Sequence, residues 1–85
     1  MTKKEKTKRL DCYSDFYTAA TAYYKNSSGT THLTFIKHGK RLLEELKEQK
    51  LLSRCDLVEE KLSKSDGYDK YLAEDILVLG SLVRS

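Results

Sequence analysis

The sequence predicts an all-α fold, a compact bundle of about four helices joined by short connections. Of its 33 apolar residues, 13 are Leu and only five are Val or Ile, while Lys and Glu dominate the polar positions. This usage is typical of helices rather than strands. The chain has no Pro and four Gly, so it lacks the usual markers of strand edges and tight loops. At 85 residues it has room for a single domain.

The chain opens with a basic segment. Residues 1–7 are polar and show no apolar periodicity, so we expect a flexible basic arm followed by a single helical domain over residues 8–85. The first helix is expected over residues 8–26, where apolar residues recur at spacings of three and four in two adjacent stripes. One stripe holds Leu10, Tyr13, Tyr17, Ala20 and Tyr24, and the other holds Cys12, Phe16, Ala19 and Tyr23.

A second helix is expected over residues 31–50, after a turn rich in Asn, Ser and Gly at residues 26–29. Its apolar face includes His32 and, near the middle, Gly39. Because Gly costs about 1 kcal/mol relative to Ala inside a helix, we expect a neighbouring helix to approach Gly39 closely. His38 falls on the solvent side, and neither histidine has the neighbours that a metal site needs.

A short third helix is expected over residues 54–64, opened by a capping box that starts at Ser53. A last helix is expected over residues 68–83, after a polar turn that contains Gly67. This helix is apolar nearly all round, which an 85-residue bundle can hardly bury by itself. Two explanations stay open: it is the central helix of the bundle, or it docks against another chain. Asp75 lies on this helix, either paired or at the rim of the packed face.

Cys12 and Cys55 are the only cysteines, and neither lies in a metal-binding pattern. No signal-peptide segment follows the basic start, so we expect two free, largely buried thiols rather than a disulfide. The longest apolar run, residues 76–79, is far shorter than the ~20 residues of a membrane span. These features predict a cytoplasmic protein without a membrane span.

No nucleotide-binding, metal-binding or catalytic motif is present in the sequence. Adjacent carboxylates such as Glu44 and Glu45 point ~100° apart on a helix, so they cannot act together as an acid and a base. We therefore expect a protein without catalysis, cofactor or small-molecule substrate.

Charge is distributed unevenly along the chain. Residues 1–41 carry a net charge of +6, and residues 42–85 carry −3. A basic patch of this kind can bind nucleic-acid phosphates, an anionic membrane or an acidic protein, or it can simply be a solvated surface that keeps a protein in solution. The candidate patch residues are Lys3, Lys4, Lys6, Lys8, Arg9, Lys37, Lys40 and Arg41.

Two function hypotheses follow. The first is a small interaction module, a regulatory or inhibitory accessory protein that docks on a larger protein or pairs with a second copy of itself. It would use the last helix or the tyrosine-rich first helix, since Tyr is enriched at interfaces. The interface candidates are Tyr13, Tyr17, Tyr24, Tyr71, Leu72, Ile76, Leu79, Leu82 and Val83. The second is a nucleic-acid-associated protein that uses the basic arm and the first two helices.

Overall fold

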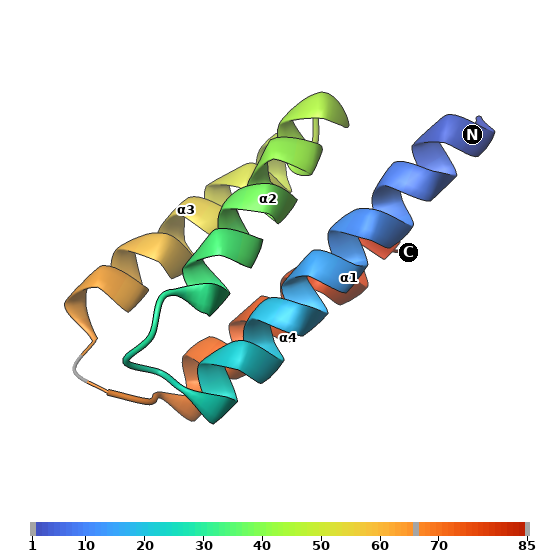
Figure 1. Cartoon of the computed structure of the whole chain (residues 1–85). Helices are drawn as coiled ribbons and strands as arrows, with labels where there is room; N and C mark the ends of the chain where they lie inside the picture. Colours follow the sequence, from blue (N-terminus) through green and yellow to red (C-terminus); the bar gives the residue numbers. More distant parts are fainter. Residues whose placement is uncertain (1, 66, 85) are drawn as a thin grey trace.

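The computed structural model confirms the all-α fold. It describes residues 2–65 and 67–84, and this part of the chain forms four helices and no strand: α1 (Lys3–Lys25), α2 (Thr31–Glu45), α3 (Gln49–Lys64) and α4 (Lys70–Arg84). Consecutive helices run in opposite directions (Figure 1). Helix α1 packs against α2 and α4, and α3 packs against the same two helices. The fold is therefore an up-down-up-down bundle with α4 opposite α2.

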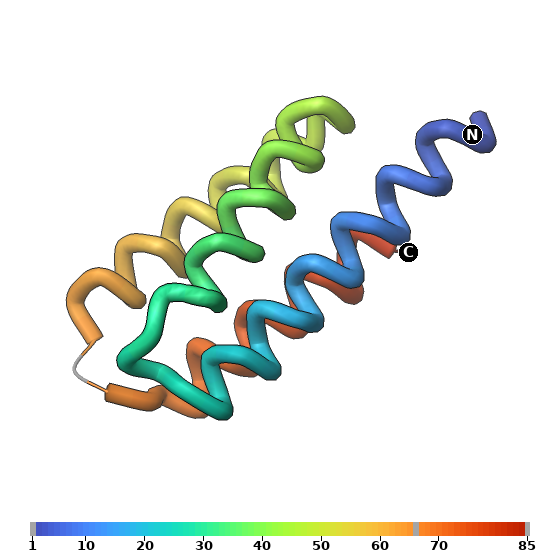
Figure 2. The backbone as a smooth tube through the Cα atoms, in the orientation of Figure 1, coloured from blue at the N-terminus to red at the C-terminus, as the bar shows by residue number. Residues whose placement is uncertain are grey.

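Helix α1 begins five residues earlier than the periodicity indicated. Thr2 caps it, because Thr2 Oγ1 accepts a hydrogen bond from the Glu5 amide at 3.1 Å. The Lys and Glu residues that follow are good helix formers, so Lys3, Lys4 and Lys6 lie on the first turns of α1. These first turns extend beyond the last turn of α4 (Figure 2), and their side chains are exposed.

The connection between α2 and α3 also differs from expectation. The chain reverses at residues 46–48, where Lys47 has a φ of 59° and the Glu48 amide donates to the Leu43 carbonyl at 3.1 Å. Helix α3 therefore starts at Gln49, so the predicted capping box is wrong. Ser53 lies inside α3, and its hydroxyl donates to the Gln49 carbonyl at 3.2 Å.

The earlier start of α3 has a packing reason. It places Leu51, Cys55 and Val58 at spacings of four and three, so the three side chains form one buried stripe. A helix that began at residue 54 would leave Leu51 outside this stripe. Burial of one more Leu, typically about 1.5–3 kcal/mol, favours the longer helix.

Phe16 lies at the centre of the core, between α2 and α4. Its side chain is fully buried, and a Cβ placed on Gly39 of α2 would lie 2.9 Å from its ring. On the other side, a Cβ on Gly80 of α4 would lie 3.4 Å from both Phe16 Cβ and the Tyr13 carbonyl oxygen. The close approach predicted at Gly39 is confirmed, and the group that approaches is the aromatic ring of α1.

Cys12 and Cys55 are both free and fully buried, as the sequence predicted. Cys12 Sγ donates to the Gly39 carbonyl at 3.3 Å. Burial, the largest cause in both cases, raises the pKa of Cys12 and of Cys55 to about 12. The two side chains act as small core residues with unreactive thiols.

Candidate functional site

Exposed apolar side chains gather around α4. Within residues 2–65 and 67–84, the large hydrophobic side chains that stay exposed come from α1, α3, α4 and the connection before α4, and none comes from α2. Contiguous exposed apolar surface marks interaction sites, whereas isolated apolar residues do not. The grooves on the two sides of α4 are therefore the candidate sites. The exposed residues are Leu10, Tyr17, Tyr24, Leu57, Tyr68, Tyr71, Leu77, Val78 and Leu82.

The first site, which we call the tyrosine groove, lies between α1 and α4 and has a volume of about 260 Å³. Tyr17 and Tyr24 are two turns apart on one face of α1 and are 55% and 72% exposed. Tyr24 meets Tyr68 edge to face, with ring centroids 5.7 Å apart. The groove is lined by Tyr17, Ala20, Thr21, Tyr24, Tyr68, Ala73 and Leu77.

Tyr23, a buried residue of α1, fixes one end of the tyrosine groove. Its hydroxyl accepts a hydrogen bond from the Asp69 amide at 2.8 Å and donates to the Gly67 carbonyl at 3.3 Å. The Tyr23 ring also lies 5.1 Å from the Tyr68 ring. Helix α1 thus holds the backbone on both sides of Tyr68, so this exposed ring is positioned before any partner binds.

His32 packs behind Tyr23, on the apolar side where the sequence placed it. It is buried, its ring centroid lies 5.0 Å from that of Tyr23, and its Nδ1 atom has no hydrogen-bond partner. Burial lowers the pKa of His32. His38 is exposed, as expected, with Nδ1 3.4 Å from a carboxylate oxygen of Asp15. In the described part of the chain, no three His, Cys, Asp or Glu residues form a metal-binding group.

The second site, which we call the charged groove, lies between α3 and α4 and has a volume of about 330 Å³. The α3 wall carries Arg54 and Lys61, and the α4 wall carries Asp75. None of these three charges has an ion-pair partner among the described residues. Asp75 is exposed, which confirms the rim position over a buried pair. The other lining residues are apolar: Leu57, Val58, Val78 and Leu79.

The predicted interface residues separate into two groups. Tyr17, Tyr24, Tyr71 and Leu82 are exposed, and Tyr13 is half-buried with the Arg84 guanidinium 5.0 Å from its ring. The rest are buried in the core of this chain, where α1 and α3 cover the main apolar stripe of α4. These core residues are Leu72, Ile76, Leu79 and Val83.

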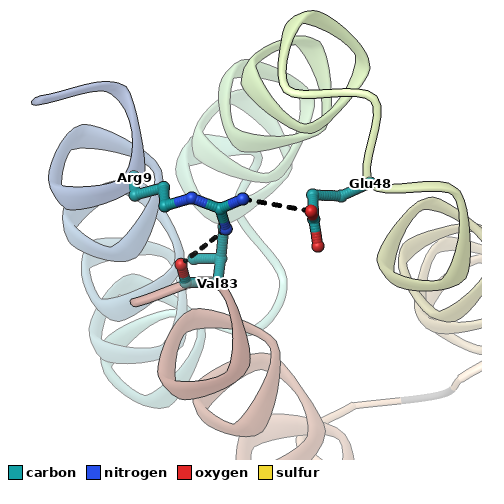
Figure 3. Close-up of polar contacts among 3 residues, drawn as sticks. All are labelled: Arg9, Glu48 and Val83. Atoms are coloured by element: carbon teal, nitrogen blue, oxygen red, sulfur yellow. Dashed lines mark hydrogen bonds and ion pairs between the residues drawn. The ribbon is translucent and has the colours of Figure 1, made fainter. Parts of the chain in front are cut away.

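Three residues of the predicted basic patch are engaged inside the chain. Lys8 lies 3.3 Å from a carboxylate oxygen of Glu45. Lys40 lies 2.6 Å from Asp56 and 3.1 Å from Glu59, and hydrogen bonds to these carboxylates raise its pKa. Arg9 binds two further partners (Figure 3): its guanidinium donates to Glu48 at 3.1 Å and to the Val83 carbonyl at 3.2 Å.

The remaining basic residues do not form one continuous patch. Lys3, Lys4 and Lys6 are exposed on the first turns of α1, whereas Lys37 and Arg41 are exposed farther along the bundle on α2. Because α1 and α2 are antiparallel and Lys8 pairs with Glu45, carboxylates from the end of α2 lie between these two groups. The surface thus offers two small basic clusters interrupted by negative charge.

Sequence reasoning missed part of both grooves. The last helix begins at Lys70 and not at Tyr68 as predicted, so Tyr68 lies in the connection before α4. Leu57 falls off the buried stripe of α3. Leu77 and Val78 gave a signal, since they extend the apolar character of α4 beyond one face.

A comparison of the chain with protein-family models, with curated proteins and with solved structures finds no match. Among the described residues, no helix is both long and apolar enough to span a membrane.

Proposed function

We propose that this protein is a small interaction module, a regulatory or inhibitory accessory protein that acts by docking on a larger protein without catalysis. The observation that supports this most directly is the tyrosine groove, which exposes three aromatic rings beside Leu77. Tyr gives large contact area at low conformational cost and is enriched in the residues that dominate binding energy. The partner surface would supply apolar side chains for the groove and polar groups for the hydroxyls.

The preorganised position of Tyr68 supports the proposal. Ordering a mobile side chain on binding costs about 0.5–1.5 kcal/mol, and a ring already packed against the rings of Tyr23 and Tyr24 avoids part of that cost. Tyr23 also holds the backbone on both sides of Tyr68 through its hydroxyl. A positioned aromatic ring lowers the cost of binding a partner, whereas a surface that only contacts water gains nothing from it. We further propose a cytoplasmic location, since two free, buried thiols suit a reducing compartment.

The nucleic-acid hypothesis is the second candidate, and one observation favours it. Lys3, Lys4 and Lys6 stand exposed on helical turns that extend beyond the bundle. Against it, Lys8, Arg9 and Lys40 already pair with carboxylates of the chain. A patch that neutralises several phosphates needs more unpaired cations on one continuous surface.

A pull-down from the native host with the purified chain as bait tests both functions. We expect a specific protein to be recovered with the wild type and lost with the Tyr17→Asp/Tyr24→Asp double variant. Leu10→Asp is the matched control, because Leu10 is 47% exposed on the same helix and does not line the tyrosine groove. Equal recovery by all three baits would contradict the docking proposal. Recovery that nuclease or moderate salt abolishes, and that depends on residues 3–6, would support the nucleic-acid function instead.

A further inference from the structure

The charged groove combines opposite charges with exposed apolar side chains. Leu57 on α3 and Val78 on α4 are 56% and 44% exposed and stand on its two walls. The α3 wall is positive through Arg54 and Lys61, and the α4 wall is negative through Asp75. All three charges lack an ion-pair partner within the described part of the chain. The groove thus combines exposed apolar side chains with charges of both signs, one sign on each wall.

We propose that the charged groove is a self-association surface, on which a second copy of this chain seats its own α4 about a two-fold axis. In such an interface a residue i contacts j while j contacts i, so the patch must be complementary to itself. The groove meets this requirement. Its positive α3 wall faces the negative α4 wall of the second copy, and the same contact forms again on the other side of the axis.

Charge complementarity favours a second copy over other occupants. A partner helix of one sign would satisfy one wall and leave the other facing a like charge, which costs free energy at an interface. A second copy satisfies both walls at once. It also covers Leu57 and Val78 symmetrically, because the exposed side of α4 in each copy fills the groove of the other.

A stable dimer would have to bury more of the surface than the charged groove alone. A standard interface buries about 800 Å² on each partner, which is about one seventh of the 5790 Å² surface of this chain. Helix α4 alone is about 22 Å long at 15 residues. The tyrosine groove lies on the other side of α4, so a dimer would leave two copies of it open.

The oligomeric state of the full chain tests this proposal. We expect sedimentation equilibrium to give a concentration-dependent dimer for the wild type. We expect Val78→Glu to weaken this dimer on the order of 100-fold, because it places an unpaired charge among the apolar side chains of the groove. Leu10→Glu is the matched control, because Leu10 is 47% exposed on α1 and does not line the groove. Circular dichroism checks that each variant stays helical.

A charge exchange tests the pairing itself. The Asp75→Arg chain has two positive walls, and the Arg54→Glu/Lys61→Glu chain has two negative walls, so we expect each to be monomeric alone. Mixed in equal amounts, the two chains present opposite charges at both contacts, and we expect a heterodimer. All three positions are on the surface, so these changes leave the core untouched.

Three results would overturn the proposal. In the first, the wild-type chain stays monomeric at the highest concentration that remains in solution. In the second, Val78→Glu does not weaken the dimer. In the third, the mixture of the two charge-exchanged chains does not associate. The substituted residues do not line the tyrosine groove. These results therefore do not test the docking proposal, which the pull-down tests separately.

Discussion

At the scale of single residues, Gly39 and Gly80 make a matched pair, since both face Phe16 from opposite sides. We expect Gly39→Ala to destabilise the protein and Gly80→Ala to be neutral or stabilising. Overpacking costs about 1–3 kcal/mol, while replacing a helical Gly by Ala returns about 1 kcal/mol. At Gly39 the new Cβ lies 2.9 Å from a ring that is fully buried, so overpacking exceeds the gain.

At Gly80 the nearest atoms are at 3.4 Å, an ordinary van der Waals contact, so the helix-propensity gain of up to about 1 kcal/mol dominates. Urea denaturation measures the free energy of unfolding of the two variants. We expect the dependence of this free energy on urea concentration to be the same in both. Equal changes in stability for both variants would contradict the packing of Phe16 described above.

His32 makes the stability of the bundle depend on pH. Its folded pKa lies below the ordinary value of 6.5, so the unfolded chain binds a proton that the folded chain does not. Stability is therefore fully present above 6.5 and is lost as the pH falls through that value toward the folded pKa. With one proton involved, the slope is at most about 1.4 kcal/mol per pH unit.

Chemical denaturation at about pH 7.5 and about pH 5.5 measures this slope, in the range where His titrates. We expect His32→Gln to flatten it and His38→Gln to preserve it, because His38 is exposed. A slope that His32→Gln leaves unchanged would contradict this assignment to His32.

The sequence predicted which face each of these residues occupies, but not what each one touches. Gly39 inside an apolar helix face is enough to predict a close approach. The approaching group is Phe16 because of how α1 and α2 are shifted along each other. The periodicity of each helix does not contain this information. The position of Tyr68 could not be predicted for the same reason. It depends on the hydrogen bond between the Tyr23 hydroxyl and the Asp69 amide, two residues that are 46 positions apart in the sequence.

At the scale of helices, Arg9 joins three elements at one end of the bundle. From α1 it binds the last turn of α4 through the Val83 carbonyl and the connection after α2 through Glu48 (Figure 3). Lys could not replace it, because a single ammonium does not offer the planar fork that reaches two partners in different directions.

We expect Arg9→Ala to lower the free energy of unfolding by about 1.5–3 kcal/mol, the range for hydrogen bonds to charged groups. The neighbouring Lys8→Ala is the control, because the Lys8–Glu45 pair is more exposed and should cost less than about 1 kcal/mol. Thermal unfolding of both variants gives the comparison. If Arg9→Ala lowers the free energy of unfolding no more than Lys8→Ala does, the contacts of Arg9 do not stabilise this end of the bundle.

The boundary between α2 and α3 shows why element ends are hard to read from sequence. The turn at residues 46–48 contains neither Gly nor Pro, and Lys47 takes a left-handed conformation that Lys rarely adopts. The capping signal at Ser53 was a chance match. Burial of Leu51 decided the boundary, and tertiary packing of this kind overrides local signals.

At the scale of the whole molecule, the two grooves and the exposed residues of the predicted basic patch lie on different parts of the bundle. The exposed apolar residues surround α4, whereas the five exposed basic-patch residues lie on α1 and α2. The last helix was expected to carry more apolar residues than one buried face can hold. Leu77 and Val78 are such residues, since they stay exposed after the core is filled. Both candidate grooves border this helix, so α4 links the core to the proposed interactions.

The two thiols report how cooperatively this bundle opens. Cys12 on α1 and Cys55 on α3 are fully buried on helices that do not pack directly against each other. Burial also raises the pKa of both to about 12, so the reactive thiolate is scarce in the native state. We expect a thiol reagent to modify both cysteines only after global unfolding, at equal rates and with the same dependence on urea.

Mass spectrometry of partly labelled protein measures the two rates separately in one sample, with the fully denatured chain as the reference for intrinsic reactivity. Helix α3 is the element whose independent opening would expose Cys55 while α1, α2 and α4 stay together. Faster labelling of Cys55 than of Cys12, with a weaker urea dependence, would therefore identify a separate opening of α3. Such an opening would also dismantle the charged groove, since α3 supplies its positive wall.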